Sequence, residues 1–346
     1  MKYFLLALML VFPCIPPLVK ALRTGHTYSL KFQVNKFQLK GKAQGTTWMI
    51  TYYATDSLIT HSQVDSILNQ IDSSLSLYKP YSLINAFNRS ATGLEVDKHF
   101  LTVIKKSIRT FNDTKGLFDI TVQPLVRAWG FGNSNITHLP DSQTVNALMK
   151  SVGSNNILVR GNSVIKKIPC VTIDVNGIAQ GYSVDVLADF LKSNKIKDFI
   201  VELGGEIRIS GRRRPSGELM KIGIEAPADA SSPNPYIQKI ISVNCGAITT
   251  SGNYRKVYES DGKKINHIIN PATGYPVNND LISVTVYARD AITADAYDNA
   301  LLLMGLKDAL KFVEKHRKMS AHFIFRRNNG QVADTASSRF PKLIEP

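Results

Sequence analysis

Cysteine is scarce in this sequence, with three residues among 346. It contains no Cys-x-x-Cys pair and no Cys/His spacing typical of zinc ligands, so the common cysteine-based zinc and dithiol motifs are excluded. Cys14 lies in the N-terminal segment, which leaves Cys170 and Cys245, both after apolar, strand-like runs. Two alternatives remain open for this pair: a disulfide in an exported protein, or two buried thiols.

Acidic residues are missing from the N-terminal part, where none precedes Asp56. Lys and Arg recur from Lys20 to Lys42, and the formal net charge of the chain is +15. A solvated basic surface accounts for this charge, and attraction to an anionic membrane face or an anionic ligand is the alternative. Because no recognised nucleic-acid-binding motif accompanies the charge, nucleic acid is disfavoured as a partner.

The apolar run at the N-terminus is shorter than the ~20 residues that a helix needs to cross a bilayer. This run, YFLLALMLVF, follows Lys2 and ends at Pro13, a layout typical of an export signal. We expect cleavage near Ala21, a lipid anchor on Cys14 or an uncleaved N-terminal anchor. All three predict an exported protein, and residues 1–21 are therefore left out of the fold.

Internal repeats and low-complexity blocks are also absent, and the hydrophobic fraction of 44% is typical of a globular protein. A capping box of Ser62 and Asp65 is expected at the start of the first helix. Helices are expected near 61–78, 97–111, 142–151, 182–194, 293–304 and 306–316. Strands are expected at 46–53, 171–175, 198–203, 206–210, 239–244, 281–288 and, as the last one, 321–325. This mixture lacks strict βαβ alternation, so it predicts an α+β fold with two interleaved lobes.

The segment VTIDVNGIAQGYSVD, residues 171–185, concentrates two glycines and two aspartates where a strand is expected to lead into a helix. Gly177 and Gly181 are separated by three residues, and Asp185 falls in the first turns of the helical pattern. Such a junction is either a tight turn or a place where the backbone approaches a ligand closely.

The segment DAITADAYDNALLLMG, residues 290–305, places Asp295 and Asn299 four residues apart on a helix, so the two side chains share a face. Both offer oxygen, the ligand atom that Mg²⁺ prefers. Asp298 lies one residue off that face. An ordinary polar helix face, with Asp295 favoured by the helix dipole, is the simpler interpretation.

Two further segments contain residue types suited to phosphate chemistry. GAITTSGNYRKVY, residues 246–258, offers hydroxyls and exposed N–H groups for a phosphate, although its composition is also that of a turn. INHIINPATGYP places His267 before an Asn-Pro break, either as a base or as a structural residue.

The order and spacing of eight motifs resemble those of one family. They are GTTW, LSLYKPYSLINAFN, FDITVQPLVRAWGFG, IDVNGIAQGYSVD, VELGGEIRISG, ITTSGNYRKVY, HIINPATGYPV and ADAYDNALLLMG. From Gly45 to Gly305 the chain thus resembles the ApbE family, the FAD:protein FMN transferases. The resemblance implies mainly antiparallel mixed sheets with helices, and an FAD site between two lobes. It divides the chain into a signal or anchor (1–21), a basic segment (22–42), an ApbE-like domain (43–330) and a C-terminal tail (331–346).

The resemblance also implies a reaction and its partners. An exported enzyme would bind FAD, split its diphosphate with Mg²⁺, attach FMN by a phosphoester to a Thr or Ser of an acceptor protein, and release AMP. The acceptors would be subunits of redox-driven ion pumps or other exported flavoproteins. The chain shows no acceptor motif of its own, so self-flavinylation is not expected.

Site residues carry over to the matching positions. Gly177, Asp295 and Asn299 would bind the metal, with Asn299 where relatives often have Thr. His267 would be the base that takes the proton of the acceptor hydroxyl. Residues expected at the cofactor are Gln44 (in place of a frequent Met), Tyr78, Leu117, Phe118, Asp119, Asp174, Gln180, Thr249, Thr250, Ser251 and Ile269. Asn270 replaces an Asp that is usual after the histidine.

Three other functions compete with transfer. An FAD pyrophosphatase would use the same metal and cofactor contacts, with water in place of the protein hydroxyl. A flavin-binding lipoprotein without turnover would not need the metal ligands. A structural surface protein would leave the series of motifs unexplained.

Overall fold

The structure is a computed structural model that describes residues 33–132, 136, 138–225, 237–253, 257–260 and 263–344. Residues 34–346 form one compact unit. The expected export segment, including Cys14, lies outside the described residues. In the described ranges, none of the helices combines the length and apolar character that crossing a membrane requires.

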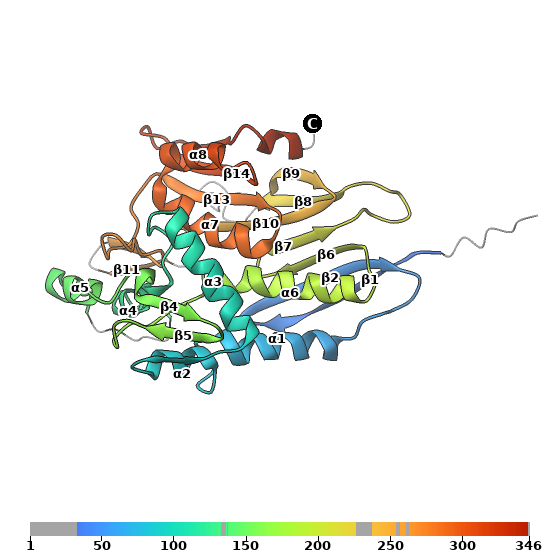
Figure 1. Cartoon of the computed structure of the whole chain (residues 1–346). Coiled ribbons are helices and arrows are strands. Elements are labelled where there is room, and N and C mark those ends of the chain that lie inside the picture. The colour runs from blue at the N-terminus through green and yellow to red at the C-terminus, as the bar shows by residue number, and fades with distance from the viewer. Residues whose placement is uncertain are drawn as a thin grey trace, which may run out of the picture. The chain divides into compact units, whose positions relative to one another are not determined.

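The main sheet has eight strands in the order β1-β2-β6-β7-β10-β13-β14-β15, and each neighbouring pair is antiparallel (Figure 1). Its strands are β1 (Asn35–Ala43), β2 (Thr46–Ala54), β6 (Asp198–Leu203), β7 (Glu206–Ser210), β10 (Cys245–Gly252), β13 (Leu281–Ala288), β14 (Met319–Arg326) and β15 (Val332–Ala336). The mixed, mainly antiparallel α+β architecture predicted from the sequence is confirmed.

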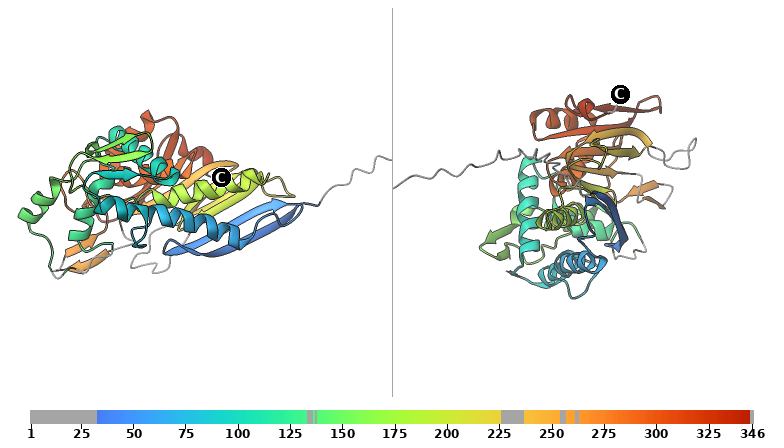
Figure 2. Two further views of the ribbon diagram at one scale, coloured as in Figure 1. Left: turned by 60° about the horizontal axis from the view of Figure 1, so that its bottom comes forward. Right: turned by 90° about the vertical axis from the view of Figure 1, so that its right-hand side faces the viewer.

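Helices cover one face of this sheet, as the two views of Figure 2 show. α6 (Ala179–Ser193) packs on β6 and β7, α7 (Ala291–Met304) packs on β10 and β13, and the two helices also contact each other. The other helices are α1 (His61–Leu75), α2 (Leu83–Arg89), α3 (Lys98–Asp113), α4 (Gln123–Ala128), α5 (Ser142–Met149) and α8 (Leu306–Lys315). Short 3-10 helices are η1 (Ile120–Val122), η2 (Ser154–Asn156) and η3 (Phe340–Leu343).

The alternation of side chains along β2 explains this layering. Trp48, Ile50 and Tyr52 are buried in one cluster with apolar residues of α1 and α6. Successive residues of a strand point to opposite faces. The opposite face of the sheet is covered by a hairpin of β8 (Met220–Glu225) and β9 (Ile237–Val243), where Ile209 and Ile248 are buried.

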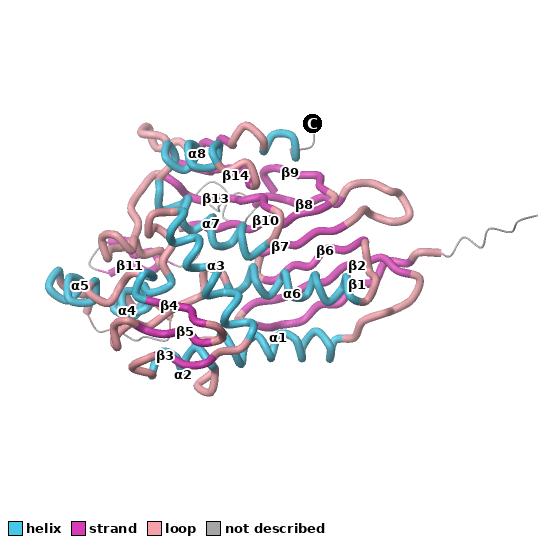
Figure 3. The backbone as a smooth tube through the Cα atoms, viewed as in Figure 1, coloured by secondary structure: helices cyan, strands magenta, loops and turns pink. Residues whose placement is uncertain are grey.

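Smaller sheets complete the unit (Figure 3). A three-stranded sheet has the order β3-β5-β4, with β3 (Gly93–Glu95), β4 (Ile157–Arg160) and β5 (Ser163–Lys166). A separate hairpin pairs β11 (Val257–Ser260) with β12 (Lys263–Asn266).

The prediction of a strand at Val171–Val175 is wrong, because the structure has no strand there. The segment is extended and its alternate residues are buried, but a side chain replaces the partner strand. The Asn88 Oδ1 atom accepts from the Ile173 N–H at 2.8 Å, and Asn88 Nδ2 donates to the Ile173 carbonyl at 2.9 Å. Alternating apolar residues indicate an extended backbone but not what it pairs with. The sequence pattern therefore could not distinguish a strand in a sheet from an extended segment bonded by a side chain.

Smaller corrections concern one cap, one strand and the cysteines. The first helix begins after Thr60, whose capping box is completed by Gln63, two residues before the predicted pair of Ser62 and Asp65. β15 follows β14 within the stretch expected as a tail, so 321–325 is not the last strand. The described cysteines, at positions 170 and 245, are exposed and free, so neither the disulfide nor the pair of buried thiols is present.

Candidate active site

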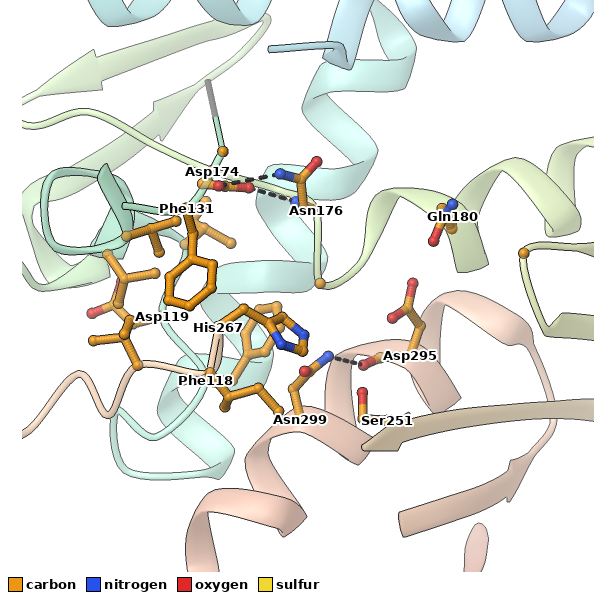
Figure 4. Close-up of a pocket in the computed structure, with 18 of the residues that line it drawn as sticks. Phe118, Asp119, Phe131, Asp174, Asn176, Gln180, Ser251, His267, Asp295 and Asn299 are labelled. Atoms are coloured by element: carbon orange, nitrogen blue, oxygen red, sulfur yellow. Dashed lines mark hydrogen bonds between the residues drawn. The ribbon is translucent and has the colours of Figure 1, made fainter. Parts of the chain in front are cut away.

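A cavity of about 440 Å³ lies where the ends of α3, α6, β10 and β12 approach α7 (Figure 4). Thr249 is the only residue carried over from the resemblance that does not line it. The others that do are Gln44, Tyr78, Leu117, Phe118, Asp119, Asp174, Gly177, Gln180, Thr250, Ser251, His267, Ile269, Asp295 and Asn299. Residues spread over more than 250 positions of the sequence are therefore brought to one cavity.

Asp295 is a buried acid on the α7 side of the cavity. Its side chain is 4% exposed, and its Oδ2 atom accepts from the Gly181 N–H at 2.8 Å. Burial raises the pKa of Asp295 to about 7, because the charged form loses its hydration. Within the described ranges, no Lys, Arg or His forms an ion pair with this carboxylate. The negative charge of the ionised Asp295 carboxylate is therefore available to bind a cation from solution.

Asn299 lies one turn after Asp295 on the same helix. Its Nδ2 atom donates to the Asp295 carbonyl at 3.3 Å and to Asp298 Oδ1 at 3.1 Å. With the amide nitrogen engaged by the protein, the amide oxygen is the atom left for a ligand. A Cβ atom at Gly177 would lie 3.2 Å from Asn299 Nδ2, so glycine permits this approach of the backbone.

These three residues fit a hard divalent cation. Together they offer one carboxylate, one amide oxygen and one backbone carbonyl, all oxygen donors. No cluster of three or more His, Cys, Asp or Glu side chains with metal-site geometry occurs in the part of the chain that the structure describes. A small oxygen donor set of this kind suits Mg²⁺, which usually retains water and takes further ligands from substrate phosphates.

Asp298 is the acid whose place in the site the sequence analysis missed. It is fully buried and accepts from Thr249 Oγ1 at 2.7 Å and from Ser251 Oγ at 2.9 Å. Burial, reinforced by the nearby Asp295, raises the pKa of Asp298 well above its usual value. The carboxylate orients the Asn299 amide, and its position three residues after Asp295 was the available signal.

The three hydroxyls of residues 249–251 are thus already bonded within the protein. Thr249 and Ser251 donate to Asp298, and the Thr250 hydroxyl lies 2.9 Å from the hydroxyl of Thr285. Alternation along β10 points Thr250 to the opposite face from its neighbours. We therefore expect Ser251 and the backbone at the end of β10 to be the parts of this segment that meet a ligand.

Asp119 lines the cavity from the end of the α3 segment, but its carboxylate is occupied. Its Oδ1 atom accepts from the Thr121 N–H at 2.8 Å, the Thr121 hydroxyl at 2.7 Å and the Ser154 hydroxyl at 2.6 Å. Its Oδ2 atom accepts from the Ser154 N–H at 3.2 Å. Burial raises the pKa of Asp119, and these hydrogen bonds oppose the shift. The side chain ties η1 to η2, and Leu117 and Phe118 beside it supply the apolar wall.

His267 follows β12 and lies across the cavity edge from Phe131, with ring centroids 6.2 Å apart in an edge-to-face arrangement (Figure 4). The Asn270 side chain stabilises the turn after the histidine, because its Oδ1 atom accepts from the Ala272 N–H at 2.9 Å. Asn and Asp serve equally in such a turn. An Asp at this position would therefore keep the same turn.

The remaining predicted contacts form the rim and the approach to α6. Asp174 accepts from the N–H and the side-chain amide of Asn176, at 2.7 and 3.2 Å, which shapes the turn before Gly177. Tyr78 is 55% exposed at the edge of the cavity. Gln44 donates to Ser183 Oγ at 2.9 Å, so its amide is held against α6.

Other lining residues were not predicted. Glu206 is buried at the start of β7, directly after the Gly204-Gly205 turn. A Cβ atom at Gly204 would lie 3.0 Å from Gln180 Nε2, so this turn supports the glutamine. The signal was available, since the segment VELGGEIRISG was among the matched motifs but no residue in it was assigned a role.

Comparison with known proteins gives a consistent result. The sequence profile of the ApbE family matches residues 44–323. A curated protein of Vibrio cholerae named FAD:protein FMN transferase is 37% identical, and the match covers 88% of this chain and 92% of the relative. One from Haemophilus influenzae with the same name is 33% identical, over 89% of this chain and 91% of the relative. The solved structure of "Flavin Transferase ApbE from Vibrio cholerae" superposes with a TM-score of 0.80 at 33% identity, covering 90% of this chain and 99% of that one.

Proposed function

This chain belongs to the ApbE family and is a flavin transferase, and on that premise we propose a Mg²⁺-dependent transfer of FMN from FAD to an exported acceptor protein. The observation that carries the proposal is the buried Asp295 carboxylate, which has no counter-cation among the described residues and shares one cavity with Asn299 and His267. The cavity volume of about 440 Å³ is within the range of small-molecule pockets.

The reaction exchanges the phosphoanhydride bond of the FAD diphosphate for a phosphoester bond to the acceptor. The acceptor hydroxyl oxygen forms a bond to the phosphorus on the FMN side of the diphosphate, and the bond from that phosphorus to the bridging oxygen breaks. AMP leaves with the bonding electron pair, and the hydroxyl proton goes to a base. Such a transfer depends mainly on positioning the reacting groups in line and neutralising charge.

His267 is the residue proposed to take the proton. An imidazole has an ordinary pKa near neutrality, so it can accept a proton from a hydroxyl as the new bond forms. The edge of Phe131 restricts the ring on one side. Asp119 plays no part in the proton transfer, because its oxygens already accept hydrogen bonds from Thr121 and Ser154.

Asp295, Asn299 and the Gly177 carbonyl are the groups proposed to hold Mg²⁺. When bound, Mg²⁺ would neutralise charge on the diphosphate oxygens. The protein's own contribution is to keep the carboxylate buried and the amide oriented through Asp298. Tyr78, Leu117, Phe118 and Gln180 are proposed to contact the flavin or adenine part of FAD.

The location and acceptor are proposals from the sequence. Residues 1–21 have the layout of an export signal or anchor, and the basic charge favours an anionic membrane surface. We propose a periplasmic enzyme that modifies a subunit of a redox-driven ion pump or another exported flavoprotein. N-terminal sequencing of the protein from membrane and periplasmic fractions tests cleavage at Ala21 against lipid on Cys14.

The central experiment incubates residues 22–346 with FAD, Mg²⁺ and an exported flavoprotein domain that carries an acceptor Thr. AMP release and the intact mass of the acceptor are followed, with EDTA as control. Metal-dependent AMP release together with an FMN mass increase supports the proposal. AMP and free FMN without the mass increase, also with the natural acceptor, would favour a pyrophosphatase. Bound FAD without products would favour a flavin binder.

A further inference from the structure

α6 and α7 come close together beside the candidate cation site. A Cβ atom at Gly181 would lie 2.5 Å from the Ala291 carbonyl oxygen and 2.7 Å from Asp295 Cβ, closer than such contacts allow. The backbones of the two helices therefore touch at this point. Any shift of one helix along the other would move Asp295 relative to the Gly177 segment that precedes α6.

Two carboxylates bond across this contact in opposite directions. Asp185 of α6 accepts from the Ala291 N–H at 3.0 Å and from the Ile292 N–H at 2.9 Å, both at the start of α7. In return, the Gly181 N–H of α6 donates to Asp295 of α7 at 2.8 Å. These three hydrogen bonds form a reciprocal clamp between the helices.

The cap of α7 is divided between two residues. The first helical N–H groups have no partner within their own helix and need an outside acceptor. The residue before the helix, Asp290, accepts from the third one, Thr293 N–H, at 3.1 Å. Asp185 takes the first two from a neighbouring helix. Asp290 thus caps the N-terminus of α7 from within its own segment, whereas Asp185 fixes the position of this N-terminus relative to α6.

Arg208 of β7 forms an ion pair with the Asp185 carboxylate. Its Nε atom lies 3.4 Å from Asp185 Oδ1, and both side chains are largely buried, with 14% and 16% exposed. Arg208 points to the helix-covered face of β7, the same face as Glu206 two residues earlier, which lines the cavity. The clamp is therefore attached to the sheet as well as to both helices.

We infer that Asp185 is a positioning residue for the cation site: it does not line the cavity but sets the register of α7 that places Asp295 beside Gly181 and Asn299 beside Gly177. This inference rests on the proposed function, in which Asp295 and Gly177 hold the cation. It also accounts for the two aspartates and two glycines in residues 171–185: Asp174 shapes the turn, Gly177 and Gly181 allow close approach, and Asp185 orients the partner helix.

The test compares Asp185→Ala with Asp290→Ala in the full chain. Both variants remove a cap from the start of α7 and should lower Tm. Asp185→Ala should lower it more, because it also leaves the largely buried Arg208 without its carboxylate. Binding of Mn²⁺ alone, a paramagnetic substitute for Mg²⁺, is titrated by electron paramagnetic resonance. We expect Asp185→Ala to weaken Mn²⁺ binding about tenfold or more, in line with residues that orient metal ligands, and Asp290→Ala to change it by less than about twofold.

Equal Mn²⁺ affinities in wild type and Asp185→Ala would overturn the inference, as would equal losses in the two variants. If Asp185→Ala does not fold, Asp185→Asn replaces it; this variant keeps one acceptor oxygen, and an affinity between wild type and Asp295→Ala supports the inference, whereas wild-type affinity overturns it. Asp295→Ala separates the two proposals. If it binds Mn²⁺ as wild type does, the cation site itself is wrong, whatever Asp185 does.

Discussion

Acids are treated in opposite ways at the cavity end of α7, where they are buried, and at the β14–β15 edge of the sheet, where Asp334 is largely exposed. At the edge, Asp334 lies 2.9 Å from Lys239 Nζ and 2.9 Å from His322 Nε2. Partial burial raises the pKa of Asp334, but the bonds and charges of Lys239 and His322 outweigh it and hold the pKa below its usual value. At the cavity, Asp295 and Asp298 are more deeply buried, and burial raises both pKa values.

The difference separates stability from function. At the edge the chain itself supplies the neutralising groups, Lys239 and His322, to Asp334. An unneutralised buried charge costs several kcal/mol. Near the cavity the described residues give Asp295 an N–H group and no cation. We interpret this imbalance as a cost in stability that is retained because a cation from solution binds there.

Asp295→Ala should produce the largest change on the cavity side. We expect Mg²⁺-dependent AMP release to fall ~100-fold or more, since a bound cation contributes several kcal/mol of charge stabilisation. Tm should change little, because removal of an uncompensated buried carboxylate offsets the loss of the acceptor for the Gly181 N–H. AMP release with and without EDTA measures the loss, and thermal unfolding provides the control. Full activity in this variant would disprove the metal assignment.

His267→Ala should come next. If His267 is the base, FMN transfer to the acceptor should slow by ~100-fold, which is typical of losing a general base. The affinity for FAD should change less than about threefold. Acceptor mass spectrometry and flavin fluorescence measure the two quantities. Equal losses in both would make His267 a pocket residue and not a base.

Asp334→Ala is the matched variant on the other side of the comparison. It leaves Lys239 without its ion pair and the buried His322 without its acceptor, so we expect a loss of ~2 kcal/mol in the free energy of unfolding. FMN transfer by the folded protein should be unchanged. Urea unfolding and the transfer assay test this; reduced transfer in the folded variant would contradict the separation of roles.

Acid should weaken the β14–β15 edge. Burial lowers the pKa of His322 below 6.5, so the unfolded chain binds this proton more readily than the folded chain does. The stability linked to His322 is complete above pH 6.5 and is lost as pH falls below it. The depressed pKa of Asp334 acts with the same sign below pH 3.8. Unfolding at pH 7.5 and 5.5 should show a decrease that His322→Gln reduces; a pH-independent result would contradict it.

Asn270→Asp should have the smallest effect. Either side chain offers an oxygen to the Ala272 N–H, so the turn after His267 is kept. We expect FMN transfer to change by less than about threefold. An increase of tenfold or more would show that an acid here acts on the histidine, contrary to the geometry.

Much of the fold follows from local pattern. The strand at Leu281–Ala288 has the predicted bounds, and α7 begins two residues before its predicted start. Prediction failed where a side chain replaced a regular partner, as Asn88 does for Val171–Val175. Ser62 and Asp65 were chosen as a capping box, although Thr60 and Gln63 fit the pattern better, because the third residue after the cap is then Gln.

The site was predicted unevenly for a similar reason. Asp295 and Asn299 are related by helical periodicity, so their shared face could be predicted from spacing. The role of Asp185 could not, because its partners begin another helix more than 100 residues later. The spacing of residues along the sequence identifies neighbours within one helix, whereas the clamp depends on the contact between α6 and α7.

The hydrogen bond from Gly181 to Asp295 makes one backbone amide a natural spectroscopic reporter. This N–H points at the carboxylate proposed to hold the cation, so its proton and nitrogen resonances depend on the electron density of that oxygen. A cation that draws charge from the carboxylate would move this resonance without any change of fold. The occupancy of the site can then be followed by magnetic resonance at a single glycine, with no substrate and no label other than ¹⁵N.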